Sequence, residues 1–188
     1  MQLAYMDDSG TRDKGNPFQT MTTVIVPDDE FFGMEILMKV SAEVIVPENA
    51  KRPFEEFHAF ELYGGYGSFE GVDQDKRFDA IKSLLSFVKT CNSSVVYGAV
   101  DKRKLAEKLY GSADPVNMCF RICVEGVEEW IAAKHSGEMV LLVVDDCEKE
   151  IKKTLRASFK RHRNQVWEAE SKKYDWTFHD DMSRGGKG

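Results

Sequence analysis

The sequence lacks the features that mark membrane proteins, secreted proteins and disulfide-bonded scaffolds. No apolar run approaches the roughly 20 residues of a membrane-spanning helix, and no basic stretch followed by an apolar one opens the chain. The chain has only four cysteines, none of them paired in a CxxC spacing. We therefore expect buried thiols rather than disulfides or a zinc site, in a cytoplasmic protein without a membrane anchor.

The motifs of several common enzyme classes are also missing. The sequence contains no P-loop, no Gly-x-Gly-x-x-Gly after a strand and no Gly-x-Ser-x-Gly elbow. The glycine-rich segment Tyr63–Gly71 has no lysine where a P-loop requires one, and we interpret it as a flexible loop. The composition of the whole chain, 42% hydrophobic and 31% charged over 188 residues, is typical of one globular domain.

Charge is distributed unevenly along the chain. A net charge of -6 disfavours a passive nucleic-acid coat but not a nuclease, because bound metal ions reverse the local sign of its carboxylates. Segment 149–163 carries seven basic residues and one acid, and the spacing of its apolar residues predicts a helix with one buried edge. Such a helix can bind nucleic-acid phosphates, and a solvated face is the alternative. The predicted contacts are Lys152, Lys153, Arg156 and Lys160.

The hydrophobic pattern predicts an α/β fold in a single domain that spans residues 1–188. Period-two and β-branched runs predict strands at 3–6, 18–26, 94–100, 139–144 and 174–178. Helical periodicity predicts helices that begin near Asp28 or Asp29, at 78–88, at 115–130 and in the basic segment. The run Met139–Val144 suits a central strand covered on both faces. This order predicts a mixed sheet with helices on both faces.

Two predicted strands end in the same way, with a pair of acids. Asp7-Asp8 follows the first strand and Asp145-Asp146 follows the strand at 139–144. If these strands lie parallel and adjacent, Asp7 and Asp145 share one sheet edge about 4.8 Å apart, where Mg²⁺ or Mn²⁺ would bridge their carboxylates. The alternative is that these acids make turns and cap helices.

Glu56, His58 and Glu61 form a second group of candidates. In an extended segment Glu56 and His58 point the same way, whereas in a helical turn His58 and Glu61 share a face. Either arrangement places a carboxylate beside an imidazole, which suits metal binding or proton transfer. A hydrogen-bonded structural histidine is the alternative.

Three short motifs occur in order along the chain. They are Tyr-Met-Asp-Asp-Ser-Gly at 5–10, Glu-Phe-His-Ala at 56–59 and Val-Val-Asp at 143–145. In order and spacing they resemble the family called domain of unknown function 3800, which opens with Tyr-x-Asp-Glu-Ser-Gly and has His-Ala in its second motif. The resemblance covers nearly the whole chain. Asp8 stands where the family has glutamate, a side chain longer by one methylene.

The resemblance implies a ribonuclease H-like fold and a metal-dependent nuclease site. Carried over by position, it makes Asp7, Glu56 and Asp145 metal ligands, with His58 as a neighbour that contacts substrate or transfers a proton. The family ends with a helix bearing Gln-x-x-Asp, whose acid completes the site. This chain stops at Gly188, about where that helix would begin. We therefore expect a missing C-terminal helix: either the natural protein is longer, or this copy lacks one ligand.

These observations predict a phosphodiesterase that cleaves nucleic acid with Mg²⁺ or Mn²⁺. The alternative is a non-catalytic domain that binds nucleic acid or protein, in phage defence or in mobile elements. Hydrolysis of a small phosphorylated metabolite is a third option that the acidic composition permits. The pattern specifies neither DNA nor RNA, and no oligomeric state.

Overall fold

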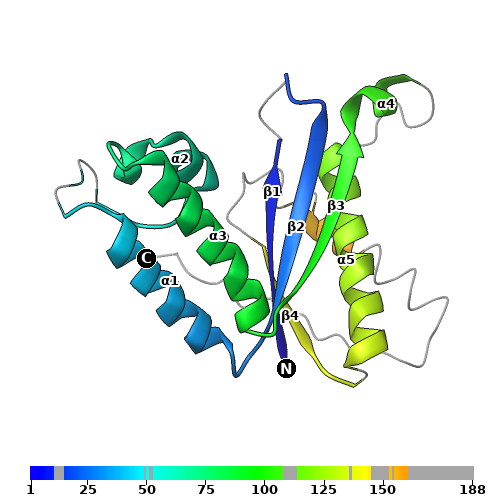
Figure 1. The fold of residues 1–188 in the computed structure, drawn as a ribbon. Helices are drawn as coiled ribbons and strands as arrows, with labels where there is room; N and C mark the ends of the chain where they lie inside the picture. Colours follow the sequence, from blue (N-terminus) through cyan, green and yellow to red (C-terminus); the bar gives the residue numbers. More distant parts are fainter. Residues whose placement is uncertain are drawn as a thin grey trace, which may run out of the picture. The chain divides into compact units, whose positions relative to one another are not determined.

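The structure, a computed structural model, describes most of the chain up to residue 160 (Figure 1). The described residues are 1–10, 15–48, 50, 53–107, 114–135, 137–144, 153 and 155–160. They belong to two compact units, Met1–Glu148 and Lys149–Gly188. The single-domain organisation of the chain stays a prediction.

The first unit contains most of the described strands and helices. Its strands are β1 (Gln2–Ser9), β2 (Phe18–Pro27), β3 (Ser94–Asp101) and β4 (Val140–Val144). Its helices are α1 (Phe31–Ile45), α2 (Ala59–Gly64), α3 (Gln74–Thr90), α4 (Lys102–Glu107) and α5 (Pro115–Lys134), with a 3₁₀ turn η1 (Gly67–Phe69). Sequence periodicity does not predict α2, η1 and α4, because elements of six residues or fewer are too short to show it.

The strands form one mixed sheet in the order β3-β2-β1-β4. β2 is antiparallel to both of its neighbours, and β4 is parallel to β1. The predicted mixed α/β fold is therefore confirmed. The prediction that residues 139–144 form a covered central strand is wrong for the part of the chain that the structure describes, since β4 is the last strand there and Leu141 is 54% exposed. An apolar run alone does not reveal whether anything packs over it.

One face of the sheet packs against α5 to form the core. Ala4 of β1 and Ile25 of β2 are fully buried against Val127 and Ile131 of the helix. The helix begins at Pro115, as its sequence predicts, and the side chain of Asp114 accepts a hydrogen bond from the backbone N–H of Val116. The packing of this face supplies much of the hydrophobic stabilisation of the unit.

Close contact between α5 and the sheet depends on small residues and on thiols. A Cβ at Gly98 would lie 2.9 Å from the backbone oxygen of Cys119, so a side chain there would push the helix away. The thiols of Cys119 and Cys123 donate to the backbone oxygens of Gln19 and Met21, each at 3.2 Å. Burial raises the pKa of the Cys119 thiol to about 11. The described cysteines are free and buried, as predicted.

Helices α1, α2 and α3 form a second layer with a hydrophobic cluster of its own. Its most buried members are Ile45, Leu62 and Phe69. α3 is capped by Asp73, whose side chain accepts from the backbone N–H groups of residues 75 and 76. The predicted caps of α1 are wrong: the N-cap is Glu30, and its side chain makes no capping hydrogen bond. This helix is held by packing rather than by a cap.

The side of the sheet turned away from α5, which we call the open face, becomes more exposed along β1. At its beginning, Val26 of β2 pairs with Leu3 and is 1% exposed. Further along, Tyr5 is half-buried and its ring stacks on Phe31, the first residue of α1, at 6.0 Å. At the end of the strand, Asp7 is exposed. The second layer therefore leaves the open face accessible around Asp7.

The second unit is described only for a helical stretch at 153 and 155–160. Leu155 is buried and Phe159 half-buried, as the predicted buried edge requires. Lys153, Arg156 and Lys160 are exposed, while Lys152 lies outside the described residues. Among the described helices of both units, none combines the length and apolar composition that a membrane crossing requires.

Candidate functional site

Three strands end at the same edge of the sheet, because β1, β3 and β4 run in one direction. The parallel pairing of β1 and β4 continues to its last described pair, Met6 with Val144. In the sequence, an aspartate follows each of these residues directly: Asp7 on β1 and Asp145 after β4. Asp145 lies outside the described residues. The two strands lie parallel and adjacent, which is the condition under which Asp7 and Asp145 were expected to share a sheet edge.

Asp7 lies on the open face of this edge. Its Oδ1 accepts a hydrogen bond from the backbone N–H of Asp8 at 2.7 Å, which orients the carboxylate. Asp8 points to the opposite side, where its Oδ2 accepts from Nε2 of Gln19 at 3.2 Å. The two acids are therefore separated by the sheet, and only Asp7 is presented to solvent on the open face.

Glu56 and His58 contact each other, with His58 Nε2 at 3.1 Å from Glu56 Oε1. Both side chains are more than half exposed, so the pair contributes little to stability. His58 is the N-cap residue of α2 with an extended backbone, which selects the first of the two predicted arrangements. Glu61 turns instead to Gly67, where any Cβ would clash with its carboxylate.

The described residues supply only part of the predicted metal site. Asp7, Glu56 and His58 offer the carboxylate oxygens and imidazole nitrogen that divalent ions bind. Within the described ranges, however, no three acids, histidines or cysteines are gathered closely enough to hold a metal ion. These donor atoms fit the chemistry of Mg²⁺ or Mn²⁺, and the metal site itself stays a prediction.

Sequence reasoning missed the start of α4 at the same edge, residues Lys102–Lys104, which we call the basic turn. Lys102, Arg103 and Lys104 directly follow β3, and the backbone N–H of Lys102 donates to the oxygen of Pro17 at 2.8 Å. Lys102 Nζ also donates to the oxygen of Gly10 at 2.9 Å, which fixes the turn beside the β1–β2 hairpin. The sequence contained the signal for this turn. Three consecutive basic residues come just after a predicted strand, and residues in that position lie at the edge where the strand ends.

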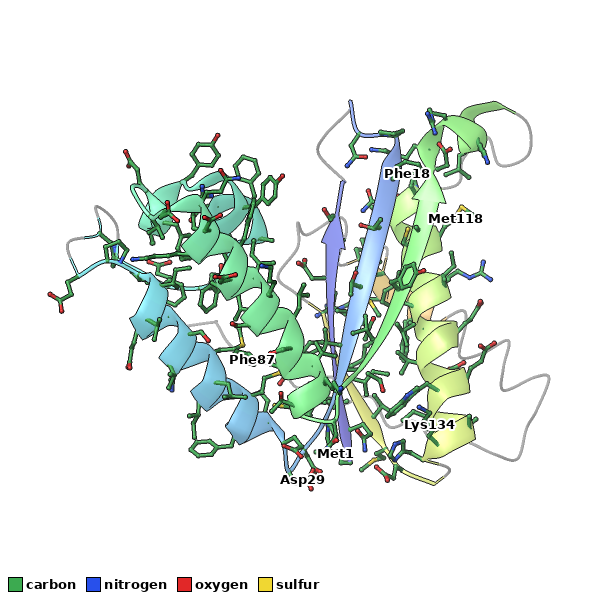
Figure 2. The ribbon with its side chains drawn as sticks, viewed as in Figure 1. Met1, Phe18, Asp29, Phe87, Met118 and Lys134 are labelled. Atoms are coloured by element: carbon green, nitrogen blue, oxygen red, sulfur yellow. The ribbon has the colours of Figure 1, made fainter. Side chains whose placement is uncertain are left out.

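Arg103 is the most constrained residue of this basic turn. Its guanidinium binds both carboxylate oxygens of Asp101, at 2.9 and 2.8 Å. These hydrogen bonds hold the pKa of Asp101 at about 2. The same guanidinium lies 5.5 Å from the centre of the Phe18 ring, and Figure 2 shows Phe18 at the opposite end of the sheet from Met1 and Asp29. The turn therefore presents positive charge at the edge that carries Asp7.

Comparisons with protein-family models, with curated proteins and with solved structures find no match to this chain. The likeness to the family called domain of unknown function 3800 accordingly rests on the three motifs.

Proposed function

We propose that the chain is a ribonuclease H-like, divalent-metal-dependent phosphodiesterase that acts on nucleic acid. The observation that carries this proposal is the register of β1 and β4, which brings Met6 and Val144 opposite each other one residue before two aspartates. The order of the four strands, with β4 parallel to β1 beside an antiparallel trio, is compatible with the ribonuclease H-like architecture.

Continuing the parallel register by one residue would make Asp7 and Asp145 direct neighbours. Paired residues of parallel strands point to the same face, and neighbouring strands lie about 4.8 Å apart. Two carboxylates at that separation repel each other unless one is protonated or a cation lies between them. The open face would then hold two acids that face solvent and favour a divalent cation.

The chain's residues would have distinct roles in this chemistry. Asp7 and Asp145 would hold the ion from the sheet, and Glu56 would hold it from the segment before α2. Bound Mg²⁺ or Mn²⁺ would polarise a phosphoryl oxygen and lower the pKa of a coordinated water. His58, paired with Glu56 at 3.1 Å, would contact the substrate or accept a proton.

Nucleic acid as the substrate is supported by the basic helix of the second unit. Lys153, Arg156 and Lys160 are exposed there, and their spacing places them on one helix face. Such a row of cations binds phosphates through charge, whatever the base sequence. Lys152, the fourth predicted contact, lies outside the described residues.

A titration of Mg²⁺ and Mn²⁺ by calorimetry tests the proposal. We expect the parent chain to bind, and Asp7→Asn to weaken binding by roughly 100-fold or more, since loss of even an outer-shell partner costs 10–100-fold. Asp8→Asn is the matched control, because it removes a neighbouring charge from the opposite side of the sheet. Equal losses in the two variants would contradict a site on the open face.

Cleavage provides the second readout. Asp7→Asn should abolish Mn²⁺-dependent cleavage of nucleic acid while its thermal unfolding temperature stays close to that of the parent. Cleavage retained in that variant would refute the nuclease. Binding of nucleic acid that needs no divalent ion, and that disappears when Lys153 and Arg156 are neutralised, would instead support the non-catalytic binding domain.

A further inference from the structure

An exposed row of residues crosses the sheet from Asp7. Asp7 pairs with Thr22 of β2, and Thr22 pairs with Tyr97 of β3. Directly paired residues of antiparallel strands point to the same face, so all three side chains lie on the open face. All three are exposed, and Tyr97 is 71% exposed. Two strand spacings place the tyrosine about 10 Å from Asp7.

The direction of the Tyr97 side chain is fixed by its neighbours on β3. A Cβ at Gly98 would touch α5, and the Val96 side chain lies against Gly126 of the same helix. Residues 96 and 98 thus face the helix, and Tyr97 must face the other way. Its ring is held out on a rigid strand rather than on a loop.

A single exposed tyrosine is ordinary on a protein surface. Tyr97 differs because β3 continues from it directly into the basic turn Lys102–Lys104, at the edge that carries Asp7. Over residues 101–104 the charges are one acid and three bases, a local net of +2. Tyr97 lies five residues before Lys102, about 16 Å along the strand. Proteins bind single-stranded nucleic acid with such a combination of exposed rings that stack the bases and cations that neutralise the phosphates.

We propose that the open face binds a single-stranded segment of nucleic acid, with an unpaired base stacked on Tyr97 and phosphates near Arg103 and Lys104. This inference rests on the proposed function, to which it adds the substrate class and a direction for the strand, from Asp7 across β2 to the end of β3. Single strands are favoured because a base in a duplex has no free face for the ring. Charge complementarity selects a polyanion over an apolar partner.

Fluorescence anisotropy of a labelled 12-nucleotide single strand tests the proposal, in EDTA and again in Ca²⁺. We expect Tyr97→Leu to weaken binding roughly tenfold or more, and Tyr97→Phe to restore it, because stacking needs the ring and not the hydroxyl. The matched control is Phe32→Leu, which removes a ring of similar exposure, 68%, from α1. Thermal unfolding verifies that each variant is folded.

The basic turn is tested by salt dependence. Arg103→Gln combined with Lys104→Gln should reduce the slope of log affinity against log salt by about 0.7 for each phosphate that the variant no longer neutralises. The control pair is Lys89→Gln with Lys134→Gln. Lys134 ends α5 at the edge near Met1, opposite Phe18 (Figure 2). If the variant with both Arg103 and Lys104 replaced kept the salt slope of the parent, phosphates would not lie near these two residues.

The outcomes separate this inference from the proposed nuclease. Strand binding that Tyr97→Leu weakens, in a chain that never cleaves with Mg²⁺ or Mn²⁺, would support the open face and refute the nuclease. Cleavage that Tyr97→Leu leaves unchanged would support the nuclease and refute strand binding on the open face. The inference would be overturned if the parent bound no single strand in either buffer or preferred duplex. It would also be overturned if Phe32→Leu weakened single-strand binding as much as Tyr97→Leu does.

Discussion

The two faces of the sheet differ although the same strands build both. On the face that packs against α5, Ala4 and Ile25 are fully buried, and a glycine lets the helix approach. On the open face, Asp7 and Tyr97 are exposed on the same strands, one residue away from buried neighbours. The difference shows that the face under α5 is buried along the strands, whereas the open face is exposed where Asp7 and Tyr97 lie.

Adjacent leucines on β4 should show the largest effect. Leu142 packs against the buried cluster that includes Ala4 and Ile25, whereas Leu141 on the open face is 54% exposed. We expect Leu142→Ala to lower the free energy of unfolding by about 2 kcal/mol, the lower end for a packed leucine, and Leu141→Ala by less than about 1 kcal/mol. Urea denaturation of the two variants measures this. Equal losses would mean that the open face also carries stability.

Gly98 allows the reverse test, in which a methyl group is added. Gly98→Ala would place a Cβ 2.9 Å from a backbone oxygen of α5. Such overpacking costs about 1–3 kcal/mol, more than the roughly 0.4–1 kcal/mol that the substitution gains by restricting the unfolded chain. Ala99→Val, on the exposed side of β3, should stay within about 0.5 kcal/mol of the parent. A stabilised Gly98→Ala in thermal or urea unfolding would contradict the close packing.

The smallest effect concerns the charges at the site edge. Arg103→Gln should raise the pKa of Asp101 from about 2 toward its ordinary value of 3.8, because the guanidinium hydrogen bonds are the main cause of the depression. Lys104→Gln, the control, should move it much less, since that lysine acts only through its charge. Carboxyl chemical shifts followed through an acid titration give both values.

The sign of the pH dependence follows from the same pair. A carboxylate whose pKa is depressed on folding stabilises the folded state above its unfolded pKa, and this contribution disappears as the pH falls. For Asp101 the loss runs from about 3.8 down to about 2. Arg103→Gln should flatten the stability profile in that window, whereas an unchanged profile would mean that the pair is not formed in solution.

Much of the fold could be predicted from local pattern. Apolar runs ended by acids predicted β1 and β4, helical periodicity predicted α3, and a proline in the first turn predicted the start of α5. The thiols were predicted to be buried because their number and spacing suit neither disulfides nor a metal. Short elements and the uncapped start of α1 were missed, because packing rather than local sequence forms them.

The candidate site was predicted only in part. Residue type and spacing singled out Asp7 and the Glu56–His58 pair. The structure shows that Glu56 and His58 contact each other and that β1 lies beside β4, while the roles of these residues stay predictions. Tyr97 could not be found this way. Ninety residues separate it from Asp7 in the sequence, and only the pairing of three strands puts the two in one row.

The sequence by itself determined which segments are strands and helices, where the acids follow the strands, and which segments are basic. These are local properties, set by side-chain periodicity and turn chemistry. The tertiary structure decided the strand order, the direction of β4, and which face α5 covers. Those depend on which distant surfaces pack best, and for that reason the separation of Asp7 from Asp8, and the row from Asp7 to Tyr97, appear only in the folded chain.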